Sequence, residues 1–139
     1  LRRNFGAIIV KNDEIISSGY TGAPRGRKNC SDLKSCRREE LNVERGTRYE
    51  LCRSVHAEQN AIISARRQDM LNGVLYLVGK EVATGELVKN AAPCSLCKRF
   101  IINAGISKVI IRDTMTNYRV IDVEEWIEND DSLNGDGSY

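Results

Sequence analysis

The 139-residue sequence has little of several residue types: one histidine, two prolines, and aromatic side chains that make up only 6% of the chain. No apolar run approaches the roughly 20 residues that a membrane-spanning helix needs, so no membrane segment is predicted. The chain does not begin with methionine, so residues are expected upstream, and its start lacks the pattern of a secretory signal. Without an internal repeat, one domain is expected over 1–128, followed by a flexible acidic tail at 129–139.

The five cysteines are an odd number in a chain with no secretory signal. This argues against a disulfide framework and favours thiols that act as metal ligands or nucleophiles in a reducing compartment. We therefore expect a cytoplasmic protein.

Charge is unevenly distributed, although the net charge is only +2. Residues 25–53 carry nine lysines or arginines against five acids, whereas the charged residues after Arg119 are all acidic. A basic central stretch can meet phosphates, but a solvated loop face would show the same composition.

Apolar patterning predicts strands at 5–12, 14–20, 73–80, 108–113 and 118–122, with 87–92 as a hairpin partner of 73–80. Helices are expected from His56 to about Arg67, from Pro93 to Gly105 and over 123–129. Residues 21–52 show no period and predict a long loop or irregular insert. The order predicts an α/β domain with helices packed on a mixed sheet, and 93–106 as a parallel crossover. Three aromatic side chains are expected in the core: Phe100, Tyr118 and Trp126.

The single histidine, His56, stands at the start of one predicted helix, and Cys94 and Cys97 stand in the first turn of the next. The positive end of a helix dipole lowers thiol pKa and favours the thiolate that a metal requires. We expect both helices on the same side of the sheet, with their N-terminal ends together. Three protein ligands with an open fourth position are the pattern of a catalytic zinc site. The sequence therefore predicts Zn²⁺ bound by His56, Cys94 and Cys97.

Glu58 follows His56 by two residues, and in mid-helix the two side chains would diverge by about 200°. In the first turn, however, both can reach along the helix axis toward one water molecule. Because two thiolates cancel the formal charge of Zn²⁺, that water would benefit from a nearby base. Glu58 is therefore predicted to be the proton carrier of a hydrolytic deamination. H-x-E followed by P-C-x-x-C is the signature of zinc nucleobase deaminases.

From about Phe5 to Trp126 the sequence resembles the zinc-dependent cytidine deaminase superfamily, and within it the deoxycytidylate (dCMP) deaminase branch. The stretches that carry the resemblance are "GAIIVKND", "GYTGAPRG", "CRSVHAEQNAI" and "APCSLCKRFIINAGISKVII". The resemblance implies a three-layer cytidine deaminase-like fold, with a mixed central sheet and helices on its faces. It implies deamination of dCMP to dUMP by a homo-oligomer, commonly hexameric, that dCTP and dTTP regulate. It also assigns zinc to His56, Cys94 and Cys97, and the acid/base role to Glu58.

Three features depart from the family's pattern. Thr21 stands where members usually have an asparagine that bonds the nucleotide, which leaves sugar recognition open. The stretch "EVATGELVKNA" is longer than the family's connection and predicts an extended hairpin beside the site. Some dCMP deaminases also carry a structural zinc, and a second zinc is expected here, with buried free thiols as the alternative. Its candidate ligands are Cys30, Cys36 and Cys52. A fourth ligand could be an upstream residue or Asp32, or there could be none.

A nucleotide phosphate needs cationic or backbone donors. The first candidates are Arg25, Arg27 and Lys28, beside the turn that contains Thr21 and Gly22, at a substrate or a regulatory site. The second candidate is Arg67, because the family places a phosphate-contacting base at this point of the helix. Arg67 lies about half a turn round from Glu58, so it is expected to act either here or only through a neighbouring subunit.

Other functions remain open from the sequence. The same metal constellation serves enzymes that deaminate bases in RNA or single-stranded DNA, but the low aromatic content and the interleaved acids argue against a nucleic-acid surface. A free-base or riboflavin-pathway substrate is a further alternative. A non-catalytic zinc protein is another, although it would have no use for Glu58.

Overall fold

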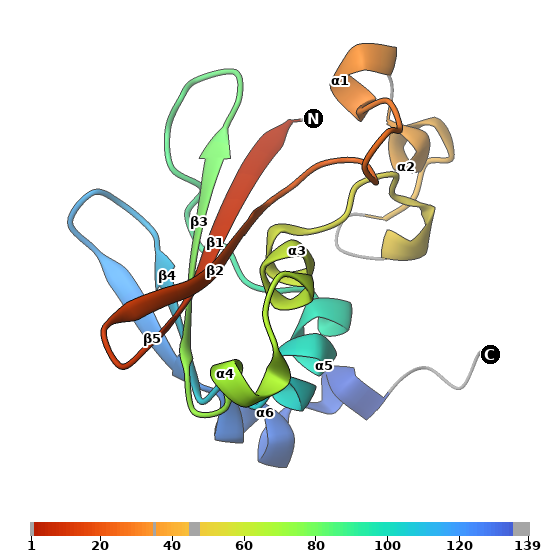
Figure 1. Cartoon of the computed structure of the whole chain (residues 1–139). Coiled ribbons are helices and arrows are strands. Elements are labelled where there is room, and N and C mark those ends of the chain that lie inside the picture. Colours follow the sequence, from red (N-terminus) through yellow and green to blue (C-terminus); the bar gives the residue numbers. More distant parts are fainter. Residues whose placement is uncertain (1, 35, 45–47, 135–139) are drawn as a thin grey trace.

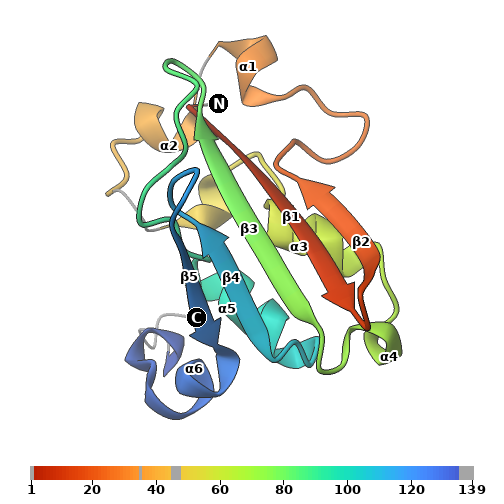
Figure 2. The ribbon, with the colours of Figure 1, turned by 90° about the vertical axis from the view of Figure 1, so that its left-hand side faces the viewer.

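Five strands form one mixed sheet in the order β2-β1-β3-β4-β5 in the computed structural model, which describes residues 2–34, 36–44 and 48–134 (Figures 1 and 2). The strands are β1 (Arg3–Lys11), β2 (Glu14–Tyr20), β3 (Val74–Glu81), β4 (Lys108–Arg112) and β5 (Tyr118–Asp122). The expected mixed sheet is therefore present. Among the described residues, 87–92 add no regular strand to it, and their contact with β3 is a single bridge from Lys80 to Leu87.

Residues Asn12 and Asp13 make the tight turn between β1 and β2. Both have positive φ, 51° and 61°, which is the backbone of the two-residue turns that match the twist of antiparallel strands. β3 and β4 pair in parallel, with the helix that contains the C-x-x-C motif between them in the chain, which confirms the predicted crossover.

The helical segments of the described chain are short. They are α1 (Cys30–Leu33), α2 (Arg37–Glu40), α3 (Ala57–Ile63), α4 (Arg67–Met70), α5 (Ser95–Asn103) and α6 (Val123–Asn129), with 3₁₀ turns at η1 (Tyr49–Leu51) and η2 (Asp131–Asn134). The helix predicted from His56 to about Arg67 is thus two helices. The hydroxyl of Ser64 bonds the carbonyl of Asn60 at 2.9 Å, a local contact that competes with helix continuation. None of the described helices has the length and apolar character that crossing a membrane would require.

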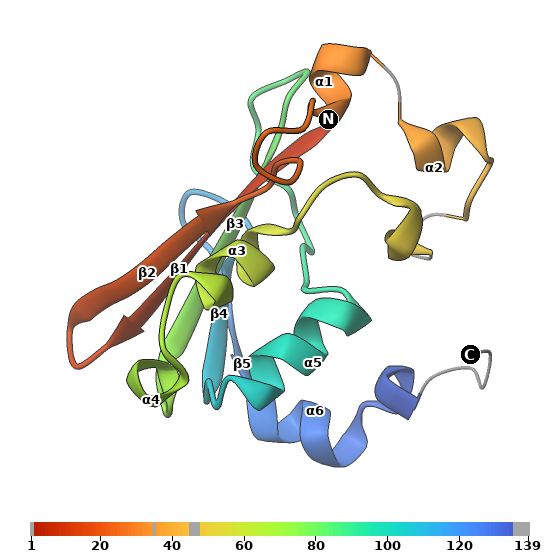
Figure 3. The same cartoon turned by 45° about the vertical axis from the view of Figure 1, so that its right-hand side comes forward.

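Helices α3 and α5 cover one face of the sheet (Figure 3). Gly19 on β2 permits the close approach of α3, because a Cβ there would lie 2.4 Å from the carbonyl oxygen of Ala57 and from the amide nitrogen of Ala61. Asn60 strengthens this contact by donating to the carbonyl of Tyr20 at 2.8 Å. The core between sheet and helices includes Ile9, Leu75, Ile101, Val109 and Ile111, all fully buried.

The opposite face of the sheet is open, and no described helix packs against it (Figure 2). Cross-strand neighbours Ile8, Tyr76, Ile110 and Val120 form a row on this face, and Tyr76 and Val120 are 39% and 54% exposed. A hollow of about 630 Å³ lies over it. The resemblance implies helices on the faces of the sheet. In the described residues the helical layer is the one formed by α3 and α5, which carries His56 and the two cysteines.

Candidate metal centre and active site

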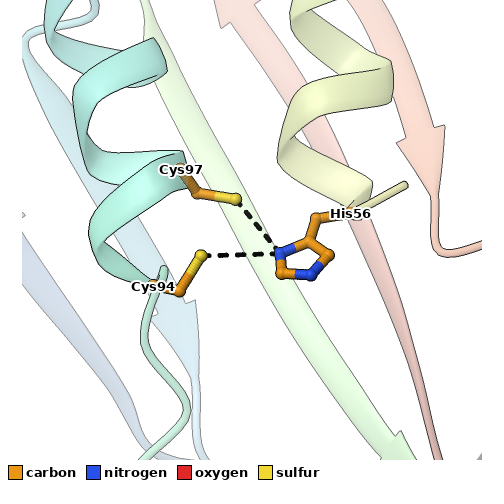
Figure 4. A group of neighbouring side chains, drawn as sticks. All are labelled: His56, Cys94 and Cys97. Atoms are coloured by element: carbon orange, nitrogen blue, oxygen red, sulfur yellow. Dashed lines mark hydrogen bonds between the residues drawn. The ribbon is translucent and has the colours of Figure 1, made fainter. Parts of the chain in front are cut away.

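The backbone places the three predicted metal ligands at the beginnings of two neighbouring helices. His56 is the N-cap residue of α3 and Cys94 is that of α5, while Cys97 lies in the first turn of α5. Figure 4 shows the imidazole and the two sulfurs pointing toward one another from these two helices. The N–H of His56 donates to the side-chain oxygen of Gln59 at 2.9 Å, which holds the backbone at the start of α3.

The distances between these ligand atoms fit a tetrahedral metal ion. His56 Nδ1 lies 3.3 Å from the Sγ atom of Cys97 and 3.6 Å from that of Cys94. Bonds of the usual Zn–N and Zn–S lengths at tetrahedral angles separate a nitrogen and a sulfur by about 3.6 Å. The donor set of one imidazole and two thiols is also that of zinc. Among the histidine, cysteine and acidic side chains of the described residues, His56, Cys94 and Cys97 are the group that could hold a metal ion.

The loop that leads into Cys94 is held by β5 and the β4–β5 turn. The guanidinium of Arg119 bonds both carboxylate oxygens of Asp113, at 2.7 and 2.9 Å, and also donates to the carbonyl of Ala91. Asp113 in turn accepts the N–H of Asn90 at 2.9 Å. This network fixes the chain three residues before Cys94, and nothing in the local sequence around the C-x-x-C motif indicates it.

Hydrogen bonding divides the charge unevenly between the two cysteines. The Cys97 thiol and the imidazole of His56 hydrogen-bond the sulfur of Cys94 and lower its pKa to about 4, so Cys94 is a thiolate. That thiolate and burial raise the pKa of Cys97. Hydrogen bonds from the imidazole to Cys52 and Cys94 raise the pKa of His56 to about 10. Because metal ligands must be deprotonated, metal binding displaces protons from Cys97 and His56.

Glu58 lies beside this cluster and is only 5% exposed. Burial raises the pKa of its carboxyl group, which lies beside the thiol of Cys97 and interacts with it. The first turn of α3 therefore carries a protonatable group next to the sulfur ligands, where the sequence predicts the proton carrier.

Cys30, Cys36 and Cys52 do not form a group of three within ligand distance among the described residues, and the second zinc stays a prediction. Cys30 is buried at the start of α1, and Cys36 precedes α2. Cys52 lies beside the imidazole of His56 and interacts with it.

The basic loop after β2 lies near the site, and one of its cations lines a cavity. A bridge between Gly22 and Val55 joins this loop to the residue before His56. Thr21 uses its backbone N–H to pair with Phe5, and Arg25, Arg27 and Lys28 are all exposed. Of these three cations only Arg27 lines a cavity of about 430 Å³, together with Pro24, Arg37, Glu40, Leu51 and Arg53.

Arg67 is at the wrong end of the helices to meet a substrate at His56. Its Nε donates to the carbonyl of Asn103 at 2.7 Å, at the C-terminus of α5, whereas Cys94 and Cys97 are at the N-terminus of the same helix. A nine-residue helix is about 13 Å long. Within one chain Arg67 therefore lies away from the three candidate ligands, and its contact with phosphate through a neighbouring subunit stays a prediction.

Sequence reasoning missed Tyr49, Arg37 and Arg53. The ring of Tyr49 packs against the imidazole of His56 with centroids 5.2 Å apart and planes at 87°. Arg37 and Arg53 join Arg27 at the cavity from different segments. The basic composition of 25–53 indicated cations here, but no periodicity showed which of them would meet.

Comparisons with known proteins agree with this geometry. Residues 2–113 match the family described as cytidine and deoxycytidylate deaminase zinc-binding region. The deoxycytidylate deaminase of Mycobacterium phage D29 is 30% identical over 114 residues, which cover 78% of this chain and 77% of the relative. That of Saccharomyces cerevisiae is 32% identical over 111 residues, and that of Schizosaccharomyces pombe is 29% identical over 110. Both matches cover 79% of this chain, which spans 31% and 30% of these two relatives.

Two solved structures share the fold. A dCMP deaminase from the cyanophage S-TIM5, crystallised in complex with dCMP and dUMP, has a TM-score of 0.51 at 24% identity, covering 94% of this chain and 74% of that one. A cytidine deaminase from Burkholderia pseudomallei has a TM-score of 0.54 at 19% identity, covering 88% and 77%. The zinc-type cluster, the mixed sheet and the family match over residues 2–113 together show that the chain belongs to the cytidine and deoxycytidylate deaminase family.

Proposed function

We propose that this chain is a zinc-dependent hydrolase that deaminates dCMP to dUMP and releases ammonia in pyrimidine deoxynucleotide metabolism. The observation that carries the proposal is the imidazole of His56 facing two cysteine sulfurs beside the buried carboxyl of Glu58. The relatives named deoxycytidylate deaminase and the fold neighbour that holds dCMP and dUMP support the choice of substrate.

His56, Cys94 and Cys97 would hold the zinc, whose Lewis acidity makes a water molecule nucleophilic near neutral pH. Glu58 takes one proton from the attacking water and passes it to the ring nitrogen of the cytosine. It then carries the second proton to the amino group. The oxygen of water bonds C4 of the base, the bond from C4 to the amino nitrogen breaks, and ammonia leaves. Burial raises the pKa of this carboxyl, which favours a group that can return a proton as well as accept one.

The 430 Å³ cavity is the proposed place of the substrate phosphate. Arg37 pairs with Glu40 at 3.4 Å, whereas the side chains of Arg27 and Arg53 have no hydrogen-bonded or ionic partner in the described part of the chain. Two available guanidinium groups match the oxygens of a phosphate. Arg53 is three residues before His56, and the bridge at Val55 keeps the loop of Arg27 close. These contacts favour Arg27 and Arg53 over Arg25 and Lys28.

Side-by-side measurement of ammonia release from dCMP, deoxycytidine, cytosine and adenosine in RNA tests the proposal. We expect the highest kcat/KM for dCMP, with activity lost on zinc chelation and restored by Zn²⁺. Preference for adenosine in RNA would establish a nucleic-acid deaminase instead. Zinc-loaded, folded protein without activity on any substrate would indicate a non-catalytic zinc protein.

We extend the proposal to assembly, regulation and compartment from the family resemblance. The chain is proposed to form a homo-oligomer, for which a hexamer is favoured. Its activity is proposed to be regulated by dCTP and dTTP. Five free cysteines suit a reducing compartment, in agreement with a cytoplasmic enzyme. Light scattering with and without each triphosphate gives the oligomer size, and a mass equal to one chain under all conditions would contradict the assembly.

A further inference from the structure

One turn outside the two site helices makes two contacts with the imidazole of His56. Tyr49 begins the 3₁₀ turn η1, and its carbonyl accepts the N–H of Cys52 at 2.9 Å. Its ring meets the imidazole edge to face. Cys52, at the end of the same turn, lies beside the imidazole and interacts with it.

A cation holds Tyr49 from a second segment. The guanidinium carbon of Arg38, in α2, lies 4.5 Å from the centre of the Tyr49 ring. A guanidinium over an aromatic face is attracted by the ring quadrupole. The turn also begins at Arg48 in the left-handed region, with φ of 51°, a conformation that persists in a non-glycine residue where surrounding contacts determine it. Arg38, Tyr49 and His56 thus form a continuous row of side-chain contacts.

The imidazole needs such support because its ring torsion has two broad, roughly equivalent wells. One places Nδ1 toward the sulfurs of Cys94 and Cys97, and the other turns that nitrogen away. The side-chain oxygen of Gln59 binds the backbone N–H of His56 and so does not itself orient the ring. The ring of Tyr49 packs against the imidazole and restricts its rotation, and Cys52 interacts with the same ring. Second partners of metal-bound histidines orient the ring in this way.

We propose that Tyr49 and Cys52 are positioning residues that hold the His56 ring with Nδ1 toward the two cysteine sulfurs, so that the segment between β2 and α3 determines the strength of metal binding. The inference rests on the proposed zinc site but not on the identity of the substrate.

The test uses zinc affinity and the spectrum of the only histidine in the chain. Zinc dissociation constants are measured by chelator competition for the wild type, Tyr49→Leu and Tyr49→Phe. The matched control is Tyr118→Leu, which removes another arginine-paired tyrosine, 5.4 Å from Arg112, on the open sheet face. We expect about 10-fold weaker zinc binding in Tyr49→Leu, the lower end of losses at such partners, and near wild-type affinity in the other two.

The imidazole ¹⁵N resonances of the zinc-loaded proteins give a second readout that a general loss of stability would not reproduce. The wild type and Tyr49→Phe should show one set of signals, and Tyr49→Leu should show broadened or doubled signals from two ring orientations.

If Tyr49→Leu does not fold, Cys52→Ala replaces it. The same weakening of zinc binding is expected in Cys52→Ala, with partial rescue by Cys52→Ser. Unchanged zinc affinity and a single wild-type imidazole set in a folded variant would overturn the proposal. A raised KM for dCMP with unchanged zinc affinity would also overturn it, because Tyr49 would then contact substrate. If neither the wild type nor any variant deaminates dCMP, only the proposed function is contradicted.

Discussion

Glu58 is the only charged side chain that is buried among the described residues. Burying a carboxyl group costs free energy unless a hydrogen bond or an opposite charge compensates for it. A group of this kind is hard to explain by packing, since an apolar side chain would fill the same space without the desolvation cost. Its position next to the sulfur ligands fits the transfer of protons during hydrolysis.

Replacing Glu58 with glutamine keeps the shape of the side chain and removes the carboxyl group that can gain and lose a proton. We expect kcat on dCMP to fall by about 10²- to 10⁴-fold, the usual contribution of a positioned acid or base, while zinc content stays unchanged. Ammonia release and metal analysis check this, with Glu14→Gln at the exposed β1–β2 turn as the control. Full activity in Glu58→Gln would remove it from the mechanism.

The arginines of the 430 Å³ cavity should distinguish a nucleotide from a nucleoside. Arg27→Ala and Arg53→Ala are each expected to raise KM for dCMP by about 10-fold, because each loses one charged hydrogen bond. KM for deoxycytidine should change little, since deoxycytidine has no phosphate. Arg66→Ala is the control, because Arg66 is an exposed arginine paired with Asp69 at 3.2 Å. Equal effects on both substrates would show that the cavity does not bind the phosphate.

At the scale of elements, the contact between β2 and α3 determines where His56 and Glu58 point. The helix approaches the strand closely because Gly19 has no side chain, and Ser17 adds a hydrogen bond to the carbonyl of Ala61 at 2.7 Å. Neither feature belongs to the motif that carries the chemistry. The sequence "SSGY" by itself indicates only a strand end.

Gly19→Ala should therefore displace α3. A Cβ at this position meets backbone atoms, which cannot rotate away, and overpacking of this kind costs about 1–3 kcal/mol of unfolding free energy. Urea denaturation measures the loss, and zinc affinity should fall with it. Gly6→Ala in the neighbouring strand is the matched control, because no atom lies within 4 Å of the added carbon. Equal stability of the two variants would mean that α3 does not depend on this contact.

Prediction from sequence succeeded for elements with a local cause. The hairpin turn at Asn12 and Asp13, the crossover helix and the last helix all follow from side-chain period and turn residues. Prediction from sequence failed at two places. The helix predicted from His56 ends near Ser64, whose hydroxyl bonds the backbone locally, and the predicted strand 87–92 contributes only a bridge to β3. Such outcomes depend on competing contacts that a period does not record.

At the scale of the whole molecule, the chain after α6 is attached to the site helix. Asp130 pairs with Lys98, which lies next to Cys97, and Lys98 also lies 5.3 Å from the centre of the Trp126 ring. The segment expected to be a free acidic tail from residue 129 therefore begins with an attached part, and the remainder, 135–139, lies outside the described residues.

The Lys98–Asp130 pair makes stability depend on pH in a definite window. Hydrogen bonds from Lys98 and then Ser132 lower the pKa of Asp130 from 3.8 to about 2. The carboxylate therefore favours the folded state above pH 3.8, and this contribution disappears as pH falls toward 2. Wild type should be more stable than Asp130→Asn at pH 7, with the difference shrinking between about pH 4 and pH 2. Thermal unfolding at several pH values measures it, with Asp131→Asn as control, and a difference that is constant down to pH 2 would contradict the assignment.

The aromatic residues illustrate what composition cannot place. Trp126 is buried as expected, at 8% exposed, but Phe100 and Tyr118 are 46% and 57% exposed. Tyr118 lines the hollow over the open face of the sheet, and no described helix covers that face. Residue type gives an average burial, whereas the face of the strand or helix on which a residue lies decides the actual one.

The sequence alone indicated the candidate metal ligands and the acid beside them, because His56, Glu58, Cys94 and Cys97 occur at helix beginnings, where short-range spacing controls direction. Only the tertiary structure placed Tyr49 and Cys52 beside the imidazole, brought Arg27, Arg37 and Arg53 to one cavity, and put Arg67 at the far end of α5. These placements arise from contacts between segments distant in the chain. Residues 21–55 have no hydrophobic period to indicate such contacts, and the described residues among them meet the site through pairs such as Gly22 with Val55 and Tyr49 with His56.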